Sequence, residues 1–70
     1  MIREGDTLYD CYPEEGIYSV FLVRGREKGV AVDGWRCDLM QVYCSTGVVT
    51  ARSDLIFTER YLNTLSPEPY

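Results

Sequence analysis

Histidine is absent from this chain of 70 residues, and cysteine occurs only three times. Without histidine, neither a Ser-His nor a Cys-His pair is available for nucleophilic catalysis. The cysteines, Cys11, Cys37 and Cys44, lack the Cys-x-x-Cys spacing, whereas a structural zinc site needs about four ligands at set spacings. We therefore expect no metal and no cofactor. We interpret the cysteines as free thiols of a reducing compartment, with a single disulfide as the alternative.

Long apolar runs are also missing. No stretch approaches the roughly 18 apolar residues that span a membrane as a helix. The N-terminal Met-Ile-Arg-Glu-Gly-Asp has no basic region followed by an apolar one, as a signal peptide would have. These two absences predict a cytoplasmic protein without membrane contact.

Basic residues are in the minority, because seven Lys and Arg stand against eleven Asp and Glu and give a net charge of −4. Proteins that bind nucleic acid gain affinity by placing Lys and Arg on phosphates, so this balance argues against a nucleic-acid partner. A protein partner fits the charge better, and plain solubility is the alternative explanation.

The chain is long enough for one domain. Because so short a chain buries only about 60% of the surface that its unfolded form exposes, its core needs large side chains. Six Tyr, two Phe and one Trp supply them. We predict a single domain over residues 1–65 and an extended, proline-rich tail over residues 66–70.

Six glycines divide the first 50 residues into short apolar segments, which is typical of an all-β domain with tight turns. The predicted strands are Asp6–Tyr12, Ile17–Arg24, Val30–Val32, Trp35–Cys44, Val48–Ala51 and Leu55–Phe57. Apolar and polar residues do not alternate regularly within Trp35–Cys44. Either both faces of this strand are buried or a bulge shifts the register near Met40 and Gln41. Five or six short strands are too few for an ordinary sandwich and favour a bent, partly closed barrel.

A short helix is predicted after the last strand. Thr58 has the side chain of an N-cap, and Glu59 in the first turn suits the helix dipole. Tyr61, Leu62 and Leu65 form an apolar stripe. At about seven residues this helix is not stable alone, so we expect it to pack on the barrel.

Four short motifs carry a resemblance to a known family: Gly5-Asp6, Gly16-Ile17, Thr46-Gly47-Val48-Val49 and Ser53-Asp54-Leu55. The chain resembles, over roughly residues 4–57, the small SH3-like β-barrel proteins found among bacteriophage accessory proteins, and more distantly KOW and Tudor barrels. The resemblance implies a five- to six-stranded SH3-like barrel with a short C-terminal helix. It also implies a phage-encoded protein that binds and modulates a host or phage protein.

Catalysis has little support in the sequence. Asp6, Asp10, Glu14 and Glu15 cluster near the first turn and are the residues from which an acid/base pair could be built. Carboxylates at a turn are usually solvated, and we expect that the protein is not an enzyme.

The candidate partner-binding residues are aromatic and basic. Trp35 follows the Asp33-Gly34 hairpin turn, where a large side chain is often half exposed, and Tyr and Trp dominate interface energetics. The full candidate set is Trp35, Tyr9, Tyr12, Arg24, Arg26 and Lys28. The alternatives are that the aromatics fill the core and that the basic residues form an ordinary charged turn.

These observations predict a non-enzymatic protein-interaction module with a protein partner of unknown identity. One alternative is a structural or homo-oligomeric subunit of the virion type, since apolar edge strands favour association. The other is a nucleic-acid-associated barrel like KOW domains, which would use the loop that contains Arg24, Arg26 and Lys28.

Overall fold

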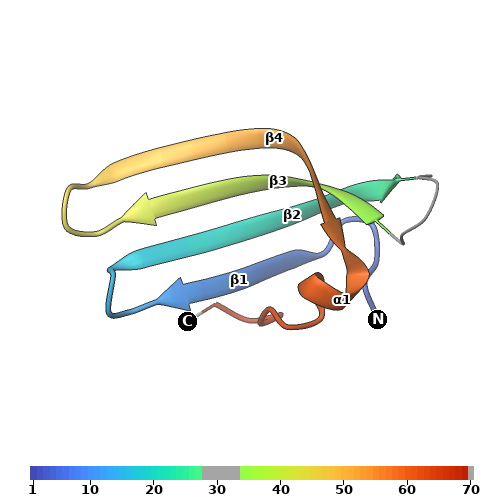
Figure 1. Ribbon diagram of the computed structural model, residues 1–70, viewed down its shortest axis with the longest axis horizontal. Helices are drawn as coiled ribbons and strands as arrows, with labels where there is room; N and C mark the ends of the chain where they lie inside the picture. The colour runs from blue at the N-terminus through green and yellow to red at the C-terminus, as the bar shows by residue number, and fades with distance from the viewer. Residues whose placement is uncertain (28–33, 70) are drawn as a thin grey trace.

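The computed structural model describes residues 1–27 and 34–69 of the chain. Four antiparallel strands form one open sheet in chain order, as Figure 1 shows. The strands are β1 (Thr7–Tyr12), β2 (Ile17–Glu27), β3 (Gly34–Tyr43) and β4 (Val48–Thr58). Helix α1 (Glu59–Leu62) follows β4 directly.

The all-β prediction with a short C-terminal helix is confirmed, but the described residues form four strands in an open sheet and not five or six in a barrel. The count is lower because the predicted strands Val48–Ala51 and Leu55–Phe57 are parts of one strand, β4. The polar segment between them, residues 52–54, continues the strand through a bulge. The predicted strand Val30–Val32 lies outside the described residues.

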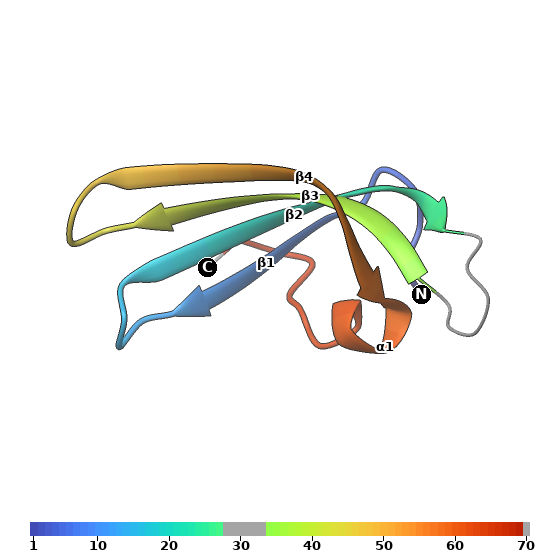
Figure 2. The same ribbon diagram turned by 45° about the horizontal axis from the view of Figure 1, so that its top comes forward.

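Two bulges flank Asp38 of β3 and bend the sheet there. On one side, Ser53 and Asp54 of β4 stand opposite the single residue Asp38, and Asp54 has a φ of 58°. On the other side, Arg24 of β2 is the extra residue in the pairing with β3. Bulges bend a strand and increase its twist, and in Figure 2 the second half of β4 turns away from the straight part and leads into α1. The predicted irregularity in β3 therefore lies slightly before Met40.

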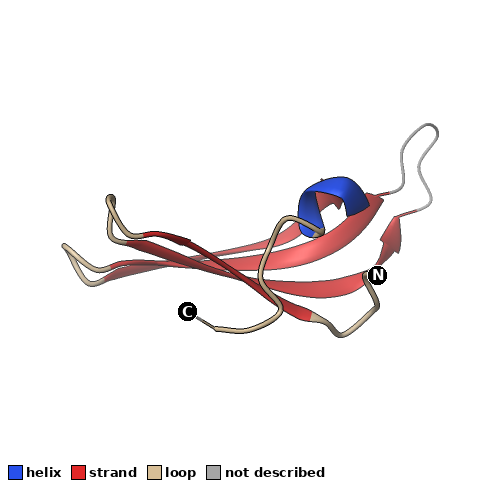
Figure 3. Cartoon of the chain, turned by 90° about the horizontal axis from the view of Figure 1, so that it is seen from below, coloured by secondary structure: helices blue, strands red, loops and turns tan. Residues whose placement is uncertain are grey.

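The hydrophobic core lies on one face of the sheet, at the bent end that α1 covers (Figure 3). The buried apolar residues are Ile2, Leu8, Phe21, Val23, Trp35, Cys37, Leu62 and Leu65. Phe57 lies against this core, with its ring centroid 5.2 Å from that of Phe21 and 5.4 Å from that of Tyr61. The helix is held to the sheet by packing, as its length requires.

The predicted N-cap of α1 is confirmed. Thr58 has extended backbone angles, and its Oγ1 accepts a hydrogen bond of 3.1 Å from the backbone N–H of Tyr61. The helix has four residues and not seven, and Leu65 reaches the core from the turn that follows it.

The C-terminal segment pairs with the outer edge of β1. The backbone N–H of Tyr9 donates to the carbonyl of Ser66 at 2.8 Å, and Ser66 returns the bond at 2.9 Å. The first residue of the predicted tail thus protects part of an edge strand. Across residues 1–27 and 34–69, no helix has the length and hydropathy to cross a membrane.

A candidate interaction surface

Trp35 is a core residue, which corrects the expectation that its side chain is half exposed. Only 7% of its surface is accessible. Its Nε1 donates a hydrogen bond of 3.4 Å to Glu59 Oε1, and the guanidinium carbon of Arg26 lies 5.1 Å from the ring centroid. The reason is strand parity: Trp35 shares a face with the buried Cys37, and α1 covers that face.

The arginines of the predicted basic loop pair with carboxylates. Arg24 Nη1 lies 3.7 Å from Asp38 Oδ2, and Arg26 Nη2 lies 3.8 Å from Glu59 Oε1. Both arginines are exposed, so each ion pair adds little stability. In each pair, the carboxylate balances the positive charge of the arginine. Lys28 lies outside the described residues. Within the described part of the loop, the structure does not assemble a cluster of unpaired cations around Arg24 and Arg26.

Tyr9 and Tyr12 lie on opposite faces of β1, so they do not form one contact surface. Tyr9 is half-buried on the face away from the core. Tyr12 is exposed on the other face, near the end of the sheet farthest from Trp35. A hydrogen bond to the Asp10 carboxylate, and then the charge of that group, raise the pKa of Tyr12 to about 12.

Two of the four carboxylates near the first turn accept hydrogen bonds from the backbone, and the other two, Glu14 and Glu15, are exposed. Asp6 Oδ2 accepts a hydrogen bond of 2.9 Å from the backbone N–H of Arg3, and Asp10 Oδ1 accepts one of 2.9 Å from Cys11. Among the residues that the structure describes, no group of three Cys, Asp or Glu side chains is placed to hold a metal ion. All three cysteines are free thiols, and burial raises the pKa of Cys37.

The face of the sheet opposite α1 carries two complete rows of uncharged side chains across all four strands. We call this surface the open face. Its rows are Tyr9–Val20–Met40–Ala51 and Cys11–Tyr18–Val42–Val49. The exposed fractions of Tyr18, Met40 and Val49 are 41%, 48% and 58%, so large apolar side chains meet solvent here.

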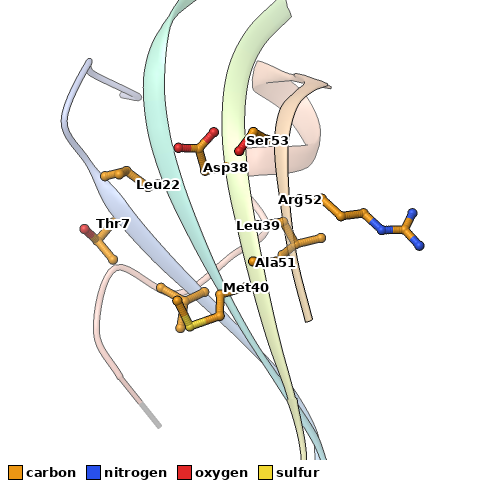
Figure 4. Close-up of a pocket in the computed structure, with 9 residues that line it drawn as sticks. Thr7, Leu22, Asp38, Leu39, Met40, Ala51, Arg52 and Ser53 are labelled. Carbon is orange, nitrogen blue, oxygen red and sulfur yellow. The ribbon is translucent and has the colours of Figure 1, made fainter. Parts of the chain in front are cut away.

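A hollow of about 430 Å³ lies where the open face meets the bend. Val20, Leu22 and Met40 are among the side chains that line it, together with the polar Asp38. Figure 4 shows Leu22, Asp38 and Met40 on one side of the sheet, with α1 on the other. Asp38 is fixed in place because its second carboxylate oxygen, Oδ1, accepts a hydrogen bond of 3.4 Å from the backbone N–H of Asp54.

The open face was not predicted from the sequence, apart from Tyr9. Apolar residues occupy both parities of Ile17–Val23, a pattern that suits a strand covered on both sides or one that curls around a small barrel. A run of this kind does not distinguish a second covered face from an exposed one. The signal in the sequence is the excess of apolar residues. It indicates a core if a second layer covers that face of the sheet, and an exposed binding surface if no layer does.

Comparison of the chain with protein-family models, with curated proteins and with solved structures gave no match.

Proposed function

We propose that this chain is a non-enzymatic protein-interaction module whose contact surface is the open face. The observation that supports this is the pair of uncharged rows on the side of the sheet away from α1. An antiparallel sheet with one face in water normally has polar side chains on that face. A contiguous apolar patch at that place is a common mark of a protein-binding surface.

The composition of the open face suits a protein partner. Tyr18 and Met40 are of the residue types enriched in interfaces, and both are exposed. Of the residues first considered, Tyr9 belongs to this surface, whereas Trp35 and Arg26 support the core beneath α1. The net charge of −4 lies outside the two rows and would speed the approach of a basic partner.

We propose that the chain is a phage-encoded accessory protein in the host cytoplasm. It would be related to the SH3-like barrels but would have an open sheet in place of the closed barrel. The basis of this proposal is the resemblance of the four short motifs, and three of their glycines lie in turns. Gly5, Gly16 and Gly47 have φ values of 90°, 66° and 72°, so each turn uses the conformation that glycine favours. The partner would be a host or phage protein that this module modulates.

Val48 and Val49 allow a test with a matched control. They are neighbours on β4 with exposed fractions of 50% and 58%, and only Val49 lies on the open face. Tagged wild-type chain, Val49→Asp and Val48→Asp are used to capture proteins from bacterial lysate. We expect a stoichiometric partner with the wild type and Val48→Asp, and its loss with Val49→Asp. Equal capture by all three chains, or no captured partner together with a wild-type chain that stays monomeric, would contradict the proposal.

A structural, homo-oligomeric subunit is the second candidate function. The outer edge of β4 pairs with no other strand in the described residues, and its segment before the bulge, residues 48–51, contains no charged residue and no Pro. Such an edge is a template for strand addition. Light scattering after size-exclusion chromatography tests it, because a closed oligomer or a growing filament is expected.

A KOW-like role has less support, because Arg24 and Arg26 both pair with carboxylates. Binding to single- or double-stranded nucleic acid at low salt would revive it.

A further inference from the structure

We infer that the open face packs against the open face of a second copy of this chain. The product is a two-sheet sandwich with a helix α1 on each outer side. This inference rests on the proposed function, since it takes the open face as a contact surface and names one occupant for it.

The chemistry of the open face suits self-association. In a two-fold symmetric dimer each surface meets an identical surface, so any charge in the patch faces a charge of the same sign nearby. The two rows contain no charged residue. Arg24 and Asp38, which adjoin the patch, form an ion pair of their own at 3.7 Å and are neutral together. The two rows therefore place no like charges opposite each other, and the remaining repulsion comes from the net charge of −4 on each copy, which salt screens.

The geometry of the sheet also suits it. From Thr7 to Tyr12 the pairing of β1 with β2 is unbroken, and both bulges lie at the bend beyond the two rows. Regular antiparallel sheets pack face to face about 10 Å apart with their strands about 30° from parallel. α1 lies over the bent end of the opposite face (Figure 3), and the row Asp10–Ser19–Gln41–Thr50 on the straight part of that face is polar and includes a carboxylate. The open face is therefore the better one on which a sandwich can form.

The area available on the open face indicates a small interface. Four strands spaced about 4.8 Å apart, each with about six residues, make a plate of roughly 400 Å² in plan. Two plates together cover roughly 800 Å² before the side-chain surface is counted, which is below the ~1,200 Å² of stable specific interfaces and in the range of weak, transient ones. The hollow beside Leu22 and Met40 adds depth in which a side chain of the second copy can lie. We therefore expect a weak dimer with a Kd in the micromolar range.

Analytical ultracentrifugation of the purified chain over micromolar to millimolar concentrations tests the inference. The weight-average mass of the wild type is expected to rise from one to two copies. Val49→Asp places a carboxylate in each contacting face and is expected to weaken the dimer at least tenfold. Val48→Asp places the same charge on the neighbouring residue of the other face and is expected to change the Kd less than twofold. Circular dichroism confirms the fold of each variant, and Met40→Gln replaces Val49→Asp if the latter does not fold.

Three results would overturn the inference. The first is a wild-type chain that stays monomeric at millimolar concentration. The second is a dimer that Val49→Asp and Met40→Gln leave unchanged, since another surface would then be in contact. The third is equal loss with Val48→Asp and Val49→Asp, which indicates pairing along the β4 edge. A monomer that still captures a lysate protein through Val49 would remove the second copy and leave the proposed function standing.

Discussion

At the scale of single residues, Trp35 is a large core side chain whose one polar group, the indole N–H, has a hydrogen-bond partner. The indole is the only one in the chain, and its N–H donates to Glu59 of α1. Arg26 lies over the ring and pairs with the same carboxylate. The contacts of Trp35 join the sheet to the helix. Its removal should therefore lower the stability of the fold more than it lowers the affinity for a partner.

We predict that Trp35→Ala lowers the free energy of unfolding by about 3–5 kcal/mol, the usual cost of truncating a buried Trp. Urea denaturation followed by circular dichroism measures it. In the wild type, acrylamide should quench tryptophan fluorescence weakly until the chain unfolds. Strong quenching in the native state would show that the indole is exposed.

Tyr12 gives a prediction about alkaline pH. Asp10 raises the pKa of the Tyr12 phenol to about 12, whereas the ordinary value is 10.0. The unfolded chain therefore loses this proton first. The contribution of Tyr12 to stability is complete below pH 10 and is lost as the pH rises towards 12.

We expect that Tyr12→Phe flattens the fall in the free energy of unfolding across this interval, because it removes one group that ionises earlier in the unfolded chain. Denaturant titrations at several alkaline pH values measure the slope. An identical slope in both proteins would show that Asp10 does not hold the phenol proton.

At the scale of elements, the two bulges around Asp38 decide the shape of the sheet. Asp38 Oδ2 lies 3.7 Å from Arg24 Nη1, and its Oδ1 accepts from the backbone of Asp54, so one carboxylate connects both irregular strands. Asp54 has a positive φ of 58°, which costs most residues about 1–2 kcal/mol and is tolerated best by Gly, Asn and Asp.

We predict that Asp54→Val destabilises the fold by about 1–2 kcal/mol and that Asp54→Gly stays within about 0.5 kcal/mol of the wild type. Ser53→Val is the matched control, because Ser53 is the exposed neighbour in the same bulge and has no positive φ. Thermal unfolding ranks the three variants. Equal destabilisation by both valines would mean that β propensity or packing, and not the φ of Asp54, sets the cost.

The elements differ in how far the sequence could predict them. Thr58 and α1 were predictable because a cap depends on the few residues beside it. The continuation of β4 through Asp54 was not, because a polar segment at a bulge and a polar segment at a corner have the same composition. The partner of that segment, Asp38, lies 16 residues earlier in the chain and is identified only by the register.

At the scale of the whole molecule, α1 covers one face of the sheet at its bent end and leaves the opposite face open (Figure 3). Phe21 and Leu8 are buried against the side of α1, whereas Met40 and Val49 on the other side are exposed. The sequence shows that both parities are apolar but not how many layers cover them. That number decides whether Met40 belongs to a core or to a binding surface, and it explains why the aromatic residues alone gave an incomplete site.

Oxidation of Met40 by dilute peroxide tests the exposure of the open face most directly. Met40 has an exposed fraction of 48%, and Met1, at 98%, serves as the internal reference. At submicromolar concentration, where we expect monomers, Met40 should be oxidised within a few-fold of its rate in the urea-unfolded chain. Raising the concentration, or adding the captured partner, should slow Met40 and leave Met1 unchanged. A Met40 that is protected in the dilute folded chain as strongly as a core residue would contradict the open face.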